Sequence, residues 1–544
     1  MPHPIKDSTP EPGNAPRLLE ALRQLTGVAC TTAGDDVGIL VRRDPSLETA
    51  GSTASAPALH CAGSRACGRD SSAERVEIRF SDDPEAPWPF RGRTVSTTLP
   101  VECAPLALGD GERVLASTRA GPLWVVKAVA GRAHYRSALA PQEIPPGGSF
   151  AQVFSGVSFM ANLPLLQLLA RSDPSGIGIE HPPRASFMFD DPNLHWSTYG
   201  YVHYARLSKQ AALENFHVSF ATIPLDAWYA HPATARRFRD NPVRLSLLVH
   251  GNNHTRHELA RELSTEGCSA LLHQARSRIE RLERRARIGV DRVMVPPHGA
   301  CSATMLAALP AAGFQGACMS SGSLAAHNPQ AEWLTTLGFR PAEQILGCAV
   351  LPRWAIVGID PGELLVAAYL GRPMILRGHH GDLREGAELL SRAARFINGL
   401  GEVAWLSNAD LMRSSFQMRM TGDTAHIRPF AKEVVVTLPP RATAFVIEPA
   451  MPGLTDEPAG FSCLVGGKLV RARCREAVPL SETANAGGNV VRVTRVTVAP
   501  KPHPIPLRGI DASSVLRRIL TETRDRLMPL ANRHPNLLYG ETRT

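Results

Sequence analysis

Between Ala185 and about Asn408, short apolar runs alternate with helix-length segments, and this alternation restricts the fold more than any other feature. Runs of this kind, separated by helical segments, are typical of parallel strands that are buried on both faces. We therefore predict an α/β fold with a parallel sheet covered by helices, either a barrel or a doubly wound sheet. The predicted strands lie at 185–189, 217–225, 243–249, 291–297, 316–320, 373–378 and 402–407.

The chain has 544 residues, which is too many for one hydrophobic core, so we expect several domains. Its composition, 44% hydrophobic and 20% charged, is that of a globular protein. The residue patterns before and after this region differ from its alternation of apolar runs and helical segments. The predicted organisation is an N-terminal accessory α/β domain at 1–150, a helical connector at 151–184, the sheet domain at 185–412, a C-terminal β-sandwich at 413–500, and a C-terminal helix and tail at 501–544.

Three finer predictions concern these flanking regions. The accessory domain is expected to begin with a helix at 16–27, and its Gly/Ala/Ser-rich segment at 51–72 is expected to be a flexible loop. Short strand-like segments separated by turns predict the β-sandwich. The C-terminal helix is expected to dock on another domain through its apolar side, which carries Val515, Leu516, Ile519, Leu520 and Leu527.

Charge and cysteine usage limit the compartment and the partners. The ten cysteines have no CxxC spacing, which favours free thiols over disulfides or a zinc ribbon. The net charge of +9 comes largely from arginines spread along helices, so we expect no nucleic-acid partner. No apolar run approaches the roughly 20 residues of a membrane span, and the start lacks the apolar region of a secretory signal. We therefore expect a cytoplasmic protein without a membrane partner, and the sequence does not indicate an oligomeric state.

Polar side chains follow four of the predicted strands at the point where each strand ends. Asp190 and Asp191 follow the first strand, and the segment HGNNH, with His250 and His254, follows the third. The turn PPHG follows the fourth strand, and RGHHGD, with His379 and His380, ends the sixth. Because the working residues of parallel α/β folds lie at the carboxyl ends of the strands, we expect these side chains to lie close together.

One carboxylate and two imidazoles from adjacent strand ends suit a divalent metal ion with open positions for water and substrate. A second carboxylate beside the ion is then placed as a general base, and a histidine across the pocket can return a proton to a leaving group. Thr255-x-x-Glu258 is a capping box, so Thr255 is expected to start a helix. Glu258 would then be explained structurally, and His250 and His254 would lie in the loop before that helix.

The ordered motifs FDD, HxxxH, PxG and a strand that ends in His resemble the polysaccharide deacetylase family, the nodulation-type carbohydrate esterases, over about residues 181–412. The resemblance implies a distorted (β/α) barrel and a divalent-metal hydrolase, most often with zinc. Such an enzyme deacetylates an N-acetylated sugar or related amide, a small molecule or a glycan, by attack of metal-bound water. The resemblance implies Asp190 as the base, Asp191, His250 and His254 as metal ligands, and His379 as the general acid, with His380 as the alternative.

The chain departs from the family pattern at three places, which indicates a divergent branch. Pro192 and Asn193 stand where the family has Gly, and Gly251 stands where it has Ser or Thr. Val295 stands where it has an Arg that orients the base, so the partner of the base is missing unless Arg353 or Arg377 replaces it.

Two other functions remain open, and so do the roles of several residues near the motifs. The chain could be a non-catalytic relative that binds a glycan or a protein, or a mononuclear iron enzyme with the same ligands. The aromatic residues after the aspartates either stack against a sugar or pack the first loop onto the barrel; they are Trp196, Tyr199, Tyr201 and Tyr204. His217, His257 and His298 are expected to be polar residues satisfied locally, with the pocket as a second place for His298.

Overall fold

The structure, a computed structural model, describes most of the chain. The described residues are 5–7, 17–26, 39–42, 58–61, 73–100, 103–129, 131–156, 158–172, 182–450, 460–480, 490–496, 509 and 512–533.

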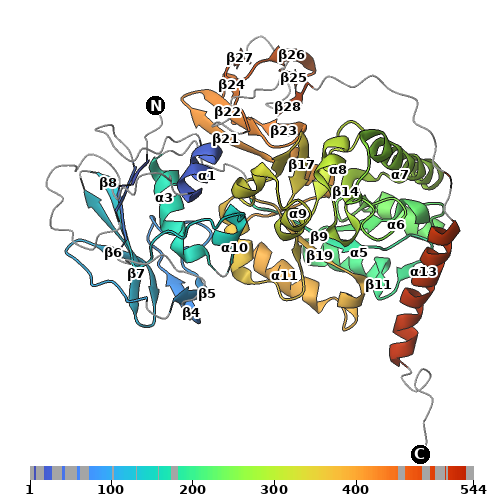
Figure 1. Ribbon diagram of the computed structural model, residues 1–544, viewed down its shortest axis with the longest axis horizontal. Helices are drawn as coiled ribbons and strands as arrows, with labels where there is room; N and C mark the ends of the chain where they lie inside the picture. Colours follow the sequence, from blue (N-terminus) through green and yellow to red (C-terminus); the bar gives the residue numbers. More distant parts are fainter. Residues whose placement is uncertain are drawn as a thin grey trace, which may run out of the picture.

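A curled, ten-stranded sheet forms the centre of the molecule (Figure 1). Its hydrogen-bonded order is β16-β17-β15-β14-β13-β12-β9-β19-β18, with β20 also paired to β9, and the pair β16–β17 is antiparallel. The order is that of an open, distorted barrel. The strands are β9 (Arg184–Asp190), β12 (Val218–Thr222), β13 (Leu245–His250), β14 (Asp291–Val295), β15 (Gly316–Cys318), β16 (Glu343–Ile345), β17 (Cys348–Leu351), β18 (Trp354–Ala355), β19 (Met374–Gly378) and β20 (Ala404–Trp405).

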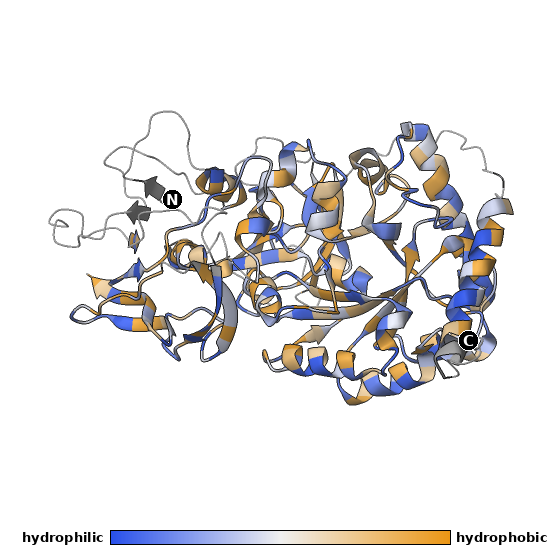
Figure 2. Ribbon diagram, turned by 60° about the horizontal axis from the view of Figure 1, so that its bottom comes forward, coloured by the Kyte–Doolittle hydropathy of each residue, from blue (hydrophilic) through white to orange (hydrophobic). Residues whose placement is uncertain are grey.

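Helices surround this sheet, and hydrophobic and hydrophilic residues alternate along them (Figure 2). Side chains on both faces of β9 and β12 are buried, which explains why their sequences are apolar throughout. The helices are α5 (Tyr204–Leu213), α6 (Pro232–Asp240), α7 (Thr265–Ala286), α8 (Ala303–Ala308), α9 (Ser321–Ala326), α10 (Pro361–Tyr369), α11 (Glu388–Asn398) and α12 (Asn408–Arg413).

Each of the seven predicted strands is present in the sheet, and the prediction of parallel pairing is confirmed for β9, β12, β13 and β19. The sequence did not reveal β16, β17 and β18. These three strands have only two to four residues each, and Pro352 separates β17 from β18, so no long apolar run marks them.

An eight-stranded sheet lies beside the barrel, in the order β1-β2-β3-β8-β7-β6-β4-β5. The predicted first helix is present as α1. The prediction of a flexible loop at 51–72 is wrong at β3, which pairs with β2 and β8; the rest of that segment lies outside the described residues. The elements are β1 (Ile5–Asp7), β2 (Ile39–Arg42), β3 (Ala58–Cys61), β4 (Ala73–Phe80), β5 (Thr94–Pro100), β6 (Arg113–Thr118), β7 (Gly121–Val129), β8 (Arg132–Ser137), α1 (Arg17–Thr26), α2 (Phe150–Val153) and α3 (Leu163–Ser172).

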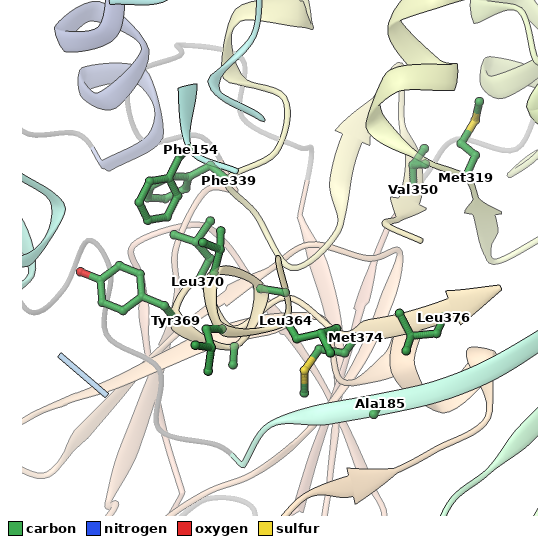
Figure 3. Close-up of a cluster of buried hydrophobic side chains, with 14 of the residues drawn as sticks. Phe154, Ala185, Met319, Phe339, Val350, Leu364, Tyr369, Leu370, Met374 and Leu376 are labelled. Carbon is green, nitrogen blue, oxygen red and sulfur yellow. The ribbon is translucent and has the colours of Figure 1, made fainter. Parts of the chain in front are cut away.

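One hydrophobic core extends from this sheet into the barrel. Figure 3 shows the junction, where Phe154 lies near Phe339 and Tyr369. The ring centroids of Phe154 and Tyr369 are 6.2 Å apart, which is within the range of aromatic pairs. Leu364 and Leu376 continue the apolar contact from α10 to β19 (Figure 3).

Two four-stranded sheets follow the barrel, in the orders β21-β22-β24-β27 and β23-β28-β25-β26. Buried residues from both sheets, among them Ile427, Phe445, Val436 and Cys463, belong to one core. The short strands β25 and β27 were not predicted. The strands are β21 (Phe416–Thr421), β22 (Thr424–Pro429), β23 (Glu433–Thr437), β24 (Ala444–Ile447), β25 (Phe461–Val465), β26 (Lys468–Ala472), β27 (Ala477–Pro479) and β28 (Val490–Arg495).

The last helix, α13 (Ala512–Arg533), lies against the outside of the barrel, at the right edge of Figure 1. The helix docks on the barrel, as predicted, but not through its apolar side, of which only Val515 is half-buried. Leu516, Ile519, Leu520 and Leu527 are 53–63% exposed, whereas the polar side chains of Arg518 and Asp525 are buried. Hydrogen bonds and ion pairs to the barrel, described below, hold the polar side in place. No helix in the described part of the chain is both long and apolar enough to cross a membrane.

His217, just before β12, is satisfied locally, as predicted: its Nδ1 lies 2.9 Å from Val243 O and its Nε2 lies 2.9 Å from Ser246 Oγ. Burial lowers the pKa of His217 from its ordinary value of 6.5 to about 4. The unfolded chain therefore takes up a proton at higher pH than the folded protein, so stability is lost as pH falls from about 6.5 to about 4. We expect this histidine to account for roughly 3 kcal/mol of that loss.

The measurement is urea unfolding of the wild type and His217→Gln from about pH 7.5 to about pH 4.5. Over roughly this range the histidine of the unfolded chain takes up its proton and that of the folded protein does not. The pH dependence of the free energy of unfolding should be clearly shallower for His217→Gln. Identical slopes for the two proteins would contradict the assignment of this pH dependence to His217.

Candidate metal centre

Asp191, His250 and His254 converge at the carboxyl ends of β9 and β13. His254 Nε2 lies 3.0 Å and His250 Nε2 lies 3.5 Å from Asp191 Oδ1. The three side chains offer ligand atoms that all lie within 4.8 Å of one another, and among the described residues no other group of three meets this criterion. Asp191 Oδ1 is buried and accepts no hydrogen bond of normal geometry although both imidazole nitrogens lie close to it, which is the situation that a bound cation relieves.

The backbone of β14 fixes the orientation of the His250 ring. His250 is buried, and its Nδ1 lies 2.9 Å from Val295 O, so Nδ1 donates to this carbonyl. Nε2 faces Asp191 and, in the neutral imidazole, carries the lone pair that a metal ion needs. A carbonyl that holds the second nitrogen in this way is the usual outer partner of a metal-binding histidine. Val295, where the family has Arg, thus contributes its carbonyl oxygen to the site.

Asp191 and His250 shift each other's pKa values toward the charged forms. Burial alone raises the pKa of Asp191, but His250 and His254 together hold it well below its ordinary value. Burial lowers the pKa of His250, and Asp191 and Asp190 reverse this so that its pKa is raised. Both carboxylates therefore favour the positively charged form of His250.

Glu258 shapes the loop that carries His254. Its Oε1 accepts the backbone N–H of Asn252 at 2.7 Å and of His254 at 2.9 Å, and its Oε2 accepts that of Asn253 at 3.0 Å. The predicted helix start at Thr255 is wrong, because α7 begins at Thr265 with Ser264 as its N-cap. His254 does lie in the loop before α7, whereas His250 is the last residue of β13, and Glu258 organises that loop from within.

The same loop explains the glycine that stands where the family has Ser or Thr. Gly251 has a φ of 60°, and a Cβ at this position would lie 2.3 Å from Glu258 Oε1 and 2.5 Å from Pro297 Cγ. A side chain at residue 251 would therefore displace Glu258, so Gly251 is required by this chain's own loop.

We expect Glu258→Gln to weaken metal binding about 10- to 100-fold, because an amide cannot accept three N–H groups and His254 loses its position. Calorimetric titration of the metal-free protein with zinc measures the affinity. Glu262→Gln, on an exposed side chain four residues away, is the matched control. Equal affinities for both variants would show that Glu258 does not position the ligand.

Asp190 precedes the candidate ligand Asp191 in the chain and forms an ion pair with Arg353. Arg353 Nη1 lies 3.1 Å from both Oδ1 and Oδ2 of Asp190, and both side chains are buried. Burial raises the pKa of Asp190, but Arg353, His250 and His379 lower it to a net value below the ordinary one. Of the two arginines proposed to replace the missing family Arg, Arg353 is the one that contacts Asp190. Arg377 instead lies 3.3 Å from His379 Nδ1.

His379 and His380 differ in their surroundings. His379 is exposed, its backbone N–H donates to Asp382 Oδ2 at 2.8 Å, and its charge influences Asp190. His380 is buried against Tyr199 and Tyr201, with ring centroids 5.6 and 6.0 Å away. Its Nε2 lies 3.6 Å from Asp525 Oδ1 of α13.

The rings of His298 and His257 continue a row of imidazoles that begins with the candidate ligands His250 and His254. The His298 ring lies 5.1 Å from that of His254 and 6.0 Å from that of His257. His298 is exposed beside the candidate ligand His254, and its place in a pocket stays a prediction. Four non-glycine residues at this site, Asp191, His254, His257 and His298, have φ values of 83°, 55°, 51° and 58°. Left-handed backbone at such residues clusters where a site is held in a fixed geometry.

The loop after β9 is packed, and α13 fastens it. Tyr199 and Tyr204 are fully buried, which decides these two aromatic residues in favour of packing, whereas Trp196 is exposed. Asn193 Oδ1 accepts a hydrogen bond from Arg526 Nη2 at 2.9 Å, and Tyr199 Oη donates to Asp525 Oδ2 at 2.9 Å. Asn193, which with Pro192 follows the aspartates in place of the family's Gly, thus anchors the C-terminal helix.

No protein-family model and no curated protein matches the chain. Solved structures that resemble it are polysaccharide deacetylases and family 4 carbohydrate esterases, the family named from the motifs. A family 4 carbohydrate esterase from Streptomyces lividans is 11% identical, with a TM-score of 0.25, over 41% of this chain and 91% of that one. A peptidoglycan deacetylase from Bacillus subtilis is 14% identical, with a TM-score of 0.23, over 42% and 90%.

A pseudoenzyme of carbohydrate esterase family 4 from Bacillus anthracis is 12% identical, with a TM-score of 0.25, over 41% of this chain and 64% of that one. At such identities and TM-scores the likeness does not decide the activity, so we base the function on the geometry of the site.

Proposed function

We propose that the protein is a divalent-metal hydrolase that removes an acetyl group from the nitrogen of an N-acetylated sugar or a related amide. The observation that carries the proposal is the pair of neighbouring aspartates in different environments. Asp191 faces two imidazoles with a buried oxygen that accepts no hydrogen bond of normal geometry, whereas Asp190 is held by Arg353. A metal ligand and a general base side by side suit hydrolysis.

Asp191, His250 and His254 would hold the ion, for which we propose zinc. One carboxylate oxygen and two imidazole nitrogens are a donor set that zinc accepts at catalytic sites, where it leaves a position open. When bound, the ion would polarise the substrate carbonyl and lower the pKa of water.

Asp190 would act as the general base. The lowered pKa keeps its carboxylate ionised at neutral pH, and Arg353 fixes its orientation. It would accept a proton from the water that attacks the carbonyl carbon of the amide. His379, which is exposed and near enough to act on the charge of Asp190, would donate a proton to the departing nitrogen as the C–N bond breaks. Acetate and a free amine are then the products.

The alternative of a non-catalytic relative rested on Val295, which stands where the family has Arg. Arg353 supplies the missing contact to Asp190, which favours a catalytic site. The alternative of a mononuclear iron enzyme shares the three ligands but does not use Asp190 and Arg353 as a base pair.

Metal analysis combined with measurement of acetate release distinguishes the hydrolase, the iron enzyme and the non-catalytic binding protein. The expected result is zinc, cobalt or nickel in the purified protein, acetate release from acetylated sugars, and loss of this release on chelation. Iron with oxygen-dependent turnover would show the oxygenase instead. Failure of the metal-loaded protein to release acetate from a panel of N-acetylated mono- and oligosaccharides would favour the binding protein.

His379→Ala is expected to lower kcat about 10²- to 10⁴-fold with little effect on stability, because it removes an exposed proton donor. His380→Ala is its matched neighbour and is expected to lower the melting temperature, since it leaves a cavity between Tyr199 and Tyr201. Steady-state acetate release and thermal unfolding measure the two effects. The reverse pattern would make His380 the acid.

A further inference from the structure

The outward face of α13 is an apolar stripe that the described part of the chain leaves uncovered. Leu516, Ile519, Leu520 and Leu527 are 59%, 56%, 63% and 53% exposed. Their spacing of three, four and seven residues places them on one side of the helix. Isolated exposed leucines are ordinary, but a contiguous apolar stripe marks a surface that binds something. We call these four residues the α13 stripe.

Polar bonds on the opposite side fix the direction in which the stripe points. Arg518 donates to Asp226 Oδ2 at 2.6 Å, and His195 Nδ1 lies 3.1 Å from Glu522 Oε1. The side chain of Asp525 accepts from Tyr199. Residues 518, 522 and 525 are one turn apart on the inward side, so rotating the helix to bury the stripe would break all three contacts.

The charges on α13 are sorted between its two sides. Glu522 and Asp525, the two acidic residues of the helix, are bonded to the barrel. Arg524 has a side chain that is 70% exposed, and its guanidinium pairs with Asp525 Oδ1 at 2.6 Å. Arg517 is also exposed, and it donates to the backbone carbonyls of Asn253 and His254. The exposed charged side chains beside the stripe are therefore arginines, whereas the acidic side chains of the helix lie on the side that faces the barrel.

Three exposed aromatic residues border the same helix. The guanidinium of Arg526 lies 5.9 Å from the Trp196 ring. The ring of His195, which bonds to Glu522, lies 4.8 Å from Trp228 and 6.2 Å from Tyr229. Trp196, Trp228 and Tyr229 are 61%, 60% and 42% exposed. Tryptophan and tyrosine favour the boundary between lipid and water, where the ring meets an apolar phase and its polar atom meets water.

We propose that the α13 stripe and the bordering aromatic residues bind the surface of a lipid bilayer that contains anionic lipids, with α13 lying in the plane of the interface. An amphipathic helix with apolar residues on one side, flanked by arginine, is suited to this position. A second copy of the chain fits less well, because pairing two such stripes would bring the flanking arginines of one helix against those of the other. This proposal revises our expectation from the sequence that the protein has no membrane partner, and it does not depend on the proposed hydrolase activity.

Sedimentation of the full chain with vesicles tests the proposal, using phosphatidylcholine alone and an equal mixture of phosphatidylcholine and phosphatidylglycerol. The wild type should bind the mixed vesicles more tightly than the neutral ones. Binding should weaken as sodium chloride is raised to about 1 M, where the Debye length is about 3 Å. Leu520→Glu/Leu527→Glu should bind at least roughly tenfold more weakly, because it places charge in the stripe.

Leu213→Glu/Leu469→Glu is the matched control: it adds the same charge at leucines that are 75% and 68% exposed elsewhere and should bind like the wild type. Thermal unfolding checks that all variants are folded. The proposal is overturned if the wild type does not bind the mixed vesicles, or if both double variants lose binding equally. It is also overturned if sedimentation velocity shows a dimer that the stripe variant alone disrupts, because the surface then belongs to a second copy.

Discussion

Asp190→Asn and Asp191→Asn, the same chemical change at neighbouring residues, are expected to fail in different ways. Asp190→Asn should keep its metal and lose about 10²- to 10⁴-fold in kcat, because an amide cannot accept the proton of the attacking water. Asp191→Asn should lose its metal, because an uncharged amide is a much weaker ligand than the carboxylate that faces His250 and His254. Metal content by mass spectrometry, with acetate release, separates the two.

Arg353 provides a control for the fold in this experiment. An amide oxygen at residue 190 can still accept from Arg353 Nη1, so the buried guanidinium keeps a partner and Asp190→Asn should remain folded. Full metal occupancy in both variants would contradict the assignment of Asp191 as a ligand. Loss of metal in both would contradict the assignment of Asp190 as a base that does not bind the ion.

Arg353→Met is expected to cost about 3–5 kcal/mol of stability, since it leaves the buried carboxylate of Asp190 without its partner. It should also raise the pKa of Asp190, because burial then acts without the main opposing charge. A carboxyl with a lowered pKa keeps its contribution to stability and catalysis above its ordinary pKa and loses it as pH falls. The acid limb of the kcat/KM profile should therefore move to higher pH in Arg353→Met.

A double-mutant cycle with Asp190→Asn isolates the contact from other effects of removing Arg353. If the pair acts as described, Arg353→Met should cost much less stability in the Asp190→Asn background than in the wild type. Arg377→Met, which removes the arginine beside His379 instead, should leave the acid limb in place. An unchanged acid limb in Arg353→Met would mean that another group sets the state of the base.

The sheet could be predicted from the sequence because burial on both faces leaves long apolar runs, as in β9 and β12. Strands β16 to β18 could not be, since they have only two to four residues and rely on tertiary pairing. The candidate ligands were found because the motif residues lie at the ends of recognisable strands. Arg353 could be named only as one of two options, because it lies 163 residues from Asp190 in the chain.

Two predictions failed because local patterns did not decide between competing uses of polar groups. Thr255 and Glu258 have the spacing of a capping box. The carboxylate of Glu258 instead accepts three backbone N–H groups of the preceding loop. In α13 the apolar pattern suggested its buried side, yet the ion pair of Arg518 with Asp226 and the contacts of Glu522 and Asp525 determine the docking.

The left-handed backbone at Asp191, His254, His257 and His298 has a practical consequence for any mutational scan. Alanine is disfavoured at such φ values, so an alanine variant would shift the loop as well as remove the functional group. Loss of activity would then report a mixture of chemistry and geometry. Asparagine tolerates this conformation and is close in size to aspartate, so it is the replacement that removes each functional group with the least change to the backbone.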